Sequence, residues 1–108
     1  MEIEKLQQEI LAFVQERDWK KFHTPRNLAA ALSVEASELL EQYLWSNNPR
    51  NEDEMKEEVA DIFYYLILFA RYENLDLEKL LLEKMKKNRE KYPVDKSRGN
   101  AKKYTELD

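Results

Sequence analysis

Four carboxylates occupy positions from which they could share a metal ion. Glu35 and Glu38 form one pair with a spacing of three residues, and Glu58 and Asp61 form a second pair further along the chain. Residues three apart lie on the same side of an α-helix, so each pair can contact one ion. Oxygen ligands with no cysteine or histidine close by favour Mg²⁺, with Mn²⁺ or Ca²⁺ as possible substitutes.

The helical positions of these residues separate them from ordinary surface charges. Glu35 falls near the middle of an apolar face formed by Leu28, Leu32, Ala36, Leu39 and Tyr43. Glu38 lies at the edge of that face, and we expect it to be the least buried of the four. Glu58 and Asp61 lie beside a second expected core face, formed by Met55, Ile62, Leu66 and Phe69. Carboxylates that converge in a partly dry space repel one another and lose hydration, which a divalent cation would relieve.

Other uses of these acidic residues are weaker. Glutamates three apart occur by chance in any acidic helix, and we accept a surface role for Glu41, Glu52, Glu54 and Glu57 as far as metal binding is concerned. A ferritin-like di-iron site needs Glu-x-x-His pairs, and the only histidine, His23, lies outside both carboxylate pairs.

A stretch of opposite charge follows the acidic one. Residues 35–61 hold nine acidic and two basic residues, whereas residues 84–103 hold nine basic and two acidic ones. On the expected fourth helix, Lys84, Asn88 and Tyr92 continue a stripe that begins with Leu77, Leu81 and Met85. Lysines with solvated tips are the simple alternative. Beside a metal site, however, cationic and amide donors suit a polyphosphate.

Four helices must position these groups, and the chain predicts an all-α, four-helix bundle-type domain over residues 1–108. The expected helices run from about Glu2 to Arg17, from Pro25 to about Trp45, from an Asn51 cap to about Glu73, and, after a short connection over residues 74–76, to about Tyr92, before a basic tail over residues 92–108. The third helix is apolar around much of its circumference. We therefore expect a second copy to cover it, in a homodimer or homotetramer.

Composition excludes several classes of protein. The single glycine, Gly99, rules out a P-loop and a dinucleotide fingerprint. No cysteine is present, and the N-terminus lacks the features of a signal peptide, so we expect a cytoplasmic protein. The longest apolar stretch, Val59–Ala70, is shorter than the ~20 residues of a membrane span. A net charge of -4 and the lack of a recognised motif argue against nucleic-acid binding.

Taken in order along the chain, these motifs resemble the MazG-like nucleotide pyrophosphohydrolases, especially the dCTP pyrophosphatase branch. Besides the two carboxylate pairs and Trp45, the resemblance rests on segments 17–27 (RDWKKFHTPRN), 84–93 (KMKKNREKYP) and 97–107 (SRGNAKKYTEL). This chain lacks the longer insertion that animal members carry between the two carboxylate helices.

The resemblance implies a Mg²⁺-dependent enzyme that converts a nucleoside triphosphate, such as dCTP or a non-standard deoxynucleotide, to the monophosphate and pyrophosphate. It places the metal on Glu35, Glu38, Glu58 and Asp61. It also implies a substrate site that contains His23, Trp45, Tyr65, Lys84, Asn88, Arg89 and Tyr92. For the general base, Glu38 and Glu41 remain open. The competing hypothesis is a non-enzymatic, helical homo-oligomeric interaction module that needs no metal.

Overall fold

The computed structural model describes residues 2–107, and every regular element in that range is helical. In chain order these elements are α1 (Ile3–Glu16), η1 (Lys20–Phe22), α2 (Pro25–Glu41), α3 (Glu52–Tyr72), α4 (Leu77–Lys91), α5 (Val94–Ser97) and η2 (Tyr104–Glu106), where η denotes a 3₁₀ turn. The predicted all-α class with four main helices is therefore confirmed.

Polar caps fix where the main helices begin. The Thr24 hydroxyl accepts a hydrogen bond from the Asn27 amide at 3.1 Å, directly before Pro25 in the first turn of α2. The Asn51 side chain accepts one from the Glu54 amide at 3.0 Å at the start of α3. Such caps satisfy amides that have no partner within the helix, and they act locally, so these two helix starts follow directly from the sequence.

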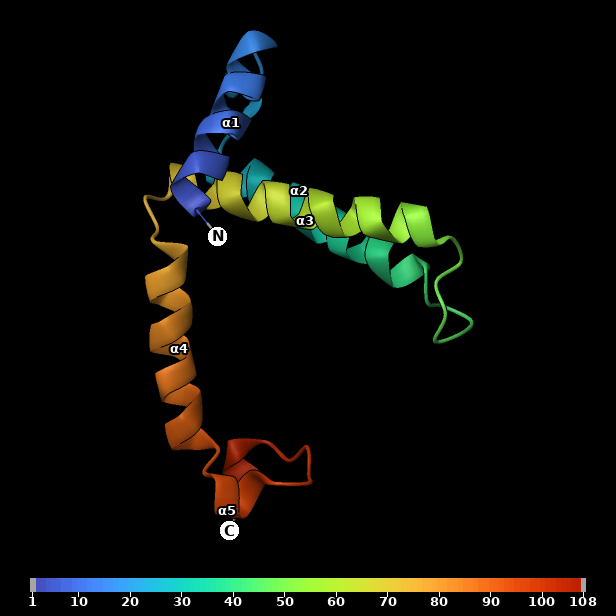
Figure 1. Ribbon diagram of the computed structural model, residues 1–108, viewed down its shortest axis with the longest axis vertical. Helices are drawn as coiled ribbons and strands as arrows, with labels where there is room; N and C mark the ends of the chain where they lie inside the picture. The colour runs from blue at the N-terminus through green and yellow to red at the C-terminus, as the bar shows by residue number, and fades with distance from the viewer. Residues whose placement is uncertain (1, 108) are drawn as a thin grey trace. The chain divides into compact units, whose positions relative to one another are not determined.

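The chain divides into two compact units, Met1–Leu75 and Asp76–Asp108. In the first unit, α2 and α3 lie side by side along their lengths, and α1 packs against α3 (Figure 1). Val14, Leu28 and Leu68, one residue from each helix, form its buried core. This core lies near the beginning of α2 and the end of α3, so the two helices run antiparallel.

Gln42 joins the opposite ends of the same two helices. Its side chain is 5% exposed and accepts a hydrogen bond from the Asn51 amide at 2.9 Å while donating one to the Glu54 carboxylate at 3.2 Å. The backbone carbonyl of Gln42 accepts a third hydrogen bond, from the Arg50 amide at 2.9 Å. One buried glutamine therefore closes the loop between α2 and α3. The second hydrogen bond of a capping box, from the Asn51 amide to the Glu54 carboxylate, does not form, because both groups bond to the Gln42 side chain instead.

Two expectations about helix boundaries and faces were wrong. α2 ends at Glu41 and not at Trp45, because Gln42 turns into the contact with α3. On α3, Leu66 of the expected core face is 37% exposed, whereas Ile67 and Leu68 are buried. The buried face of α3 is therefore rotated about the helix axis relative to the expected one, because α3 packs against both α1 and α2.

The second unit begins with α4, whose Asp76 cap accepts a hydrogen bond from the Lys79 amide at 3.1 Å. No residue of α4 is fully buried. The short elements α5 and η2 were not expected in the basic tail. Gly99 follows α5 with a φ of +81°, a conformation that glycine adopts readily. Among the described residues, no helix is long and apolar enough to cross a membrane.

We expect Gln42→Ala to lower the free energy of unfolding by about 1–3 kcal/mol, because it leaves the Asn51 amide and the Glu54 carboxylate without a buried partner. Urea denaturation measures the change. Gln8→Ala is the control, since Gln8 is exposed on α1 and should change stability by less than about 0.5 kcal/mol. Equal losses in the two variants would contradict the bracing role of Gln42.

Candidate functional site

Three of the four predicted metal ligands meet where α2 passes α3. Carboxylate oxygens of Glu35, Glu38 and Glu58 all lie within 4.8 Å of one another, and all three side chains are partly buried. Glu35 and Glu38 come from adjacent turns of α2, and Glu58 faces them from α3. The antiparallel contact between the two helices therefore brings the acidic groups together.

Two of these carboxylates have an oxygen cut off from water. The Oε2 atoms of Glu35 and Glu58 are buried, and neither has a hydrogen-bond partner among residues 2–107. A buried carboxylate oxygen without a donor is costly. A divalent cation provides a partner of the right charge for such oxygens, so the donor set fits an ion of the Mg²⁺ or Mn²⁺ type.

The pKa values of Glu35 and Glu58 also indicate that the cluster lacks a positive charge. Burial, then the side chains of Glu58 and Glu38 and the charge of Asp61, raise the pKa of Glu35 from 4.5 to about 7. For Glu58, contact with Glu35 lowers the pKa, but burial and the neighbours Glu38 and Asp61 outweigh it, and the net shift is upward. Without a cation, the site therefore favours a bound proton.

Asp61 lies next to this group without joining it. Its side chain is exposed, and it is not among the carboxylates that lie within 4.8 Å of one another, although its charge raises the pKa values of Glu35 and Glu58. The expectation that Glu38 is the least buried of the four was wrong, because Asp61 is more exposed. Asp61 lies one turn beyond Glu58, on the solvent side of α3.

Tyr65 lies one turn of α3 beyond Asp61. Burial, then the charges of Glu35, Asp61 and Glu38, raise the pKa of its phenol. The phenol therefore keeps its proton and can donate a hydrogen bond near the carboxylates. Its ring also packs edge-on against Tyr64, with the ring centroids 5.0 Å apart.

The other aromatic candidates lie elsewhere in the first unit. His23 follows η1 and packs edge-on against Tyr72, with the ring centroids 5.9 Å apart. Tyr72 is fourteen residues beyond Glu58 on α3, about 21 Å along the helix axis. Trp45 is 95% exposed in the loop after α2. Glu41, the second candidate base, is exposed in the last turn of α2, outside the carboxylate group.

The predicted phosphate contacts all lie in the second unit. Lys84 and Arg89 are exposed on α4, and Asn88 is partly buried there. Tyr92 follows α4 and packs edge-on against Tyr104, with the ring centroids 6.3 Å apart. Because these residues belong to the other compact unit, their approach to the carboxylates stays a prediction.

Gln42 was absent from the predicted set, although it braces the site. Leu28, Glu35 and Gln42 recur every seven residues, so they lie on one stripe of α2. A glutamine on a stripe that already carries a core leucine and a buried carboxylate is the signal that could have identified it.

We expect the metal-free protein to lose stability as the pH rises from about 4.5 to about 7, through Glu35. The Glu35 carboxyl keeps its proton up to about pH 7 in the folded state but releases it near pH 4.5 in the unfolded chain. The stabilisation that this proton gives is therefore complete below pH 4.5 and is lost as the pH rises to about 7. Thermal melts of the wild type and of Glu35→Gln across this range isolate the effect. The difference in melting temperature between the wild type and Glu35→Gln should change with pH over this range.

Glu57→Gln, at an exposed site on the same helix, is the matched control for these melts and should follow the wild type at every pH. His23, whose pKa burial lowers, contributes in the opposite direction and is common to all three proteins. A constant difference between the wild type and Glu35→Gln would show that Glu35 holds no extra proton.

This chain is similar to known proteins both in sequence and in structure. The model of the MazG-like family matches residues 30–107, which include all four predicted metal ligands. dCTP pyrophosphatase 1 from Bos taurus is 43% identical over 104 residues, covering 88% of this chain and 62% of the relative. The Homo sapiens protein of that name is 39% identical, with 88% and 61% covered. The chain thus spans about three fifths of the length of these relatives.

The structural comparison agrees with the sequence comparison. A crystal structure of a pyrophosphatase from Archaeoglobus fulgidus superposes with a TM-score of 0.78 and 35% sequence identity, covering 83% of this chain and 91% of that one. The family model matches well over half of the chain and includes both carboxylate pairs. This chain therefore belongs to the MazG-like family.

Proposed function

We propose that this protein is a nucleoside triphosphate pyrophosphohydrolase, which converts a deoxynucleoside triphosphate to the monophosphate and pyrophosphate. The observation that carries the proposal is the meeting of Glu35, Glu38 and Glu58, since Glu35 and Glu58 each have a buried oxygen with no hydrogen-bond partner among residues 2–107. Proteins named dCTP pyrophosphatase 1 are among its relatives, which supports dCTP or a modified deoxynucleotide as the substrate. Such a reaction would remove surplus or non-standard nucleotides.

In this proposal Glu35, Glu38, Glu58 and Asp61 hold Mg²⁺, which Mn²⁺ can replace. Bound there, the ion would neutralise phosphate charge and lower the pKa of a water molecule. Glu35 and Glu58 bind from the buried side, where each has an oxygen without a hydrogen-bond partner in the described part of the chain. Asp61 is exposed and can meet the ion from the solvent side, next to the entering triphosphate.

The general base is Glu38 or Glu41. Either carboxylate would accept a proton from the water that attacks the α-phosphorus, and pyrophosphate would leave. Glu38 belongs to the close group, whereas Glu41 is one turn further along α2 and exposed. Glu38 is supported by its closeness to the other carboxylates. Glu41 is supported because it is not one of the proposed metal ligands and could accept a proton.

The remaining predicted residues would bind the substrate. Lys84, Asn88, Arg89 and Tyr92 would meet the phosphates or the sugar, where cations offset the charge of a polyphosphate. His23, Trp45 and Tyr65 would contact the nucleoside. Of these, Tyr65 has the strongest support, because the charges of three of the carboxylates raise the pKa of its phenol.

A second copy of the chain would complete the assembly as a homodimer or a dimer of dimers. Val59, Phe63 and Leu66 recur on one side of α3 and are 49%, 36% and 37% exposed. An exposed apolar stripe of this kind is typical of a helix that packs against a partner.

Turnover tests the assignment of the site. With Mg²⁺ and a panel of triphosphates, the wild type should release pyrophosphate, and Glu35→Gln and Asp61→Asn should each lose on the order of a hundredfold in kcat/KM or more. Glu57→Gln, beside Glu58 but exposed, should keep the wild-type rate. Inactivity of the wild type toward every triphosphate would favour the interaction module.

The same assay separates a metal ligand from a base. Loss of a ligand raises the Mg²⁺ concentration that gives half-maximal rate, whereas loss of the base lowers kcat at saturating Mg²⁺ and removes the acidic limb of the pH profile. Glu38→Gln and Glu41→Gln should therefore behave differently. If neither variant lowers kcat at saturating metal, the base is another group.

Light scattering tests the assembly. The wild type should have the mass of a dimer or tetramer, and Phe63→Glu should shift it toward the monomer, because a charge in the apolar stripe would be buried on association. Glu57→Lys is the control on the same helix and should leave the mass unchanged. A monomeric wild type would contradict the assembly.

A further inference from the structure

Two adjacent tyrosines on α3 have different neighbours. Tyr64 packs edge-on against Phe13 of α1, with the ring centroids 6.3 Å apart. Tyr65 lies within reach of the charges of Glu35 and Glu38 on α2. Because α3 packs against both α1 and α2, this pair connects α1 with the side of the first unit that carries the carboxylates.

The rings of the two tyrosines also meet each other. Adjacent side chains leave an α-helix about 100° apart, so neighbours in sequence do not normally face one another. Here the ring centroids are 5.0 Å apart and the ring planes are at 81°, a favourable edge-to-face contact. Both rings also pack against the core of Val14, Leu28 and Leu68. Packing against that core explains why both rings are partly buried, but it does not require two adjacent rings to converge.

The Tyr65 hydroxyl has no hydrogen bond that would hold the side chain in place. None of the side-chain hydrogen bonds formed within residues 2–107 involves it. It is also not cut off from solvent, in contrast to the Tyr72 hydroxyl. The phenol is therefore open to a ligand, and its orientation depends on how its ring packs.

Phe13, the ring on the other side of Tyr64, is itself held at the end of α1. The Arg17 guanidinium lies over the Phe13 ring, 3.9 Å from its centroid, and donates a hydrogen bond to the Phe13 carbonyl at 3.0 Å. The rings of Phe13, Tyr64 and Tyr65 thus form a row of edge-on contacts. This row runs from α1 to the side chain beside the carboxylates.

We propose that Tyr64 is a positioning residue, which holds the Tyr65 ring so that its phenol faces a nucleoside bound beside the carboxylates. The inference rests on the proposed function, in which Tyr65 contacts the nucleoside. It assigns the role to the ring of Tyr64 and not to its hydroxyl, since the contact with Tyr65 is made by the rings. Tyr64 acts through Tyr65 and needs no contact of its own with the substrate.

Steady-state kinetics with the best triphosphate of the panel test this role. Tyr64→Leu removes the ring and should raise KM about fivefold or more while kcat changes less than about twofold, because a contact with the nucleoside stabilises bound substrate and transition state alike. Tyr64→Phe keeps the ring and should have the wild-type KM. Tyr65→Leu should raise KM by itself, and adding Tyr64→Leu to it should cause no further change.

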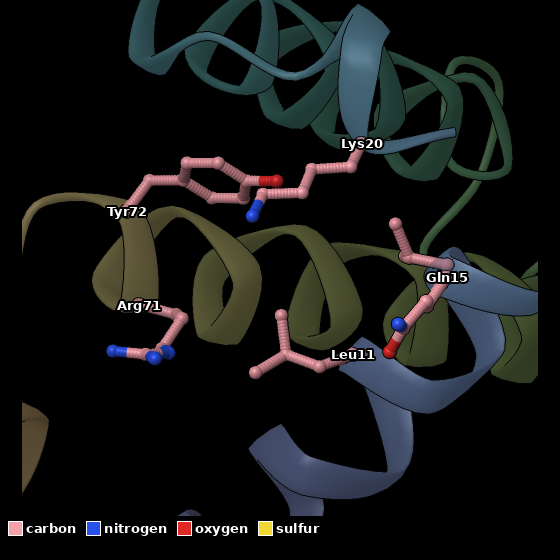
Figure 2. A pocket seen from close by; sticks show the side chains of 6 residues that line it. Leu11, Gln15, Lys20, Arg71 and Tyr72 are labelled. Carbon is pink, nitrogen blue, oxygen red and sulfur yellow. The ribbon is translucent and has the colours of Figure 1, made fainter. Parts of the chain in front are cut away.

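Leu11→Ala is the control for a loss of packing alone. Leu11 packs against the same core as the two tyrosines. Together with Tyr72 it lines a hollow of about 440 Å³ formed by α1, η1 and the end of α3 (Figure 2). Leu11→Ala should therefore lower the melting temperature and leave KM unchanged.

Phe13→Leu removes the next ring of the row and keeps the proposal testable if Tyr64→Leu does not fold. It should raise KM less than Tyr64→Leu does, and not at all in the Tyr65→Leu background. The proposal is overturned if the losses in Tyr64→Leu and Tyr65→Leu multiply, if Tyr64→Phe matches Tyr64→Leu, or if Leu11→Ala raises KM equally. An inactive wild type would instead contradict the proposed hydrolysis.

Discussion

The antiparallel contact between α2 and α3 is the constraint on which the site depends. Leu28 and Leu68 bury it at one end, and Gln42 ties it at the other with hydrogen bonds to the start of α3. Glu35 and Glu58 lie between these two fixed points. Because neither helix can slide, the two carboxylates cannot separate to recover water, and the raised pKa of Glu35 records the cost.

This arrangement stores an unfavourable interaction at the place where chemistry is proposed. Departures from the usual rules of packing are expected at functional sites, provided that the surrounding structure compensates for them. Here the compensation is the leucine core and the buried glutamine. The basic residues of α4 differ, because that helix has no fully buried residue and its cations remain solvated.

The sequence predicts the features that depend on local geometry. The starts of α2 and α3 follow from Thr24 and Asn51, because a cap needs only residues within its first turn. The carboxylate group follows from polar residues on apolar stripes. The end of α2 could not be predicted, because it depends on the contact of Gln42 with another helix.

The bracing at Gln42 has a consequence for how this protein can vary. The glutamine holds both ends of the loop between α2 and α3, so the loop can change length without moving the carboxylates. Doubling the length of a flexible loop costs only about 0.6 kcal/mol. The segment that contains the exposed Trp45 is therefore a place where residues can be added or removed at little cost in stability, which would alter what reaches the carboxylates without moving them.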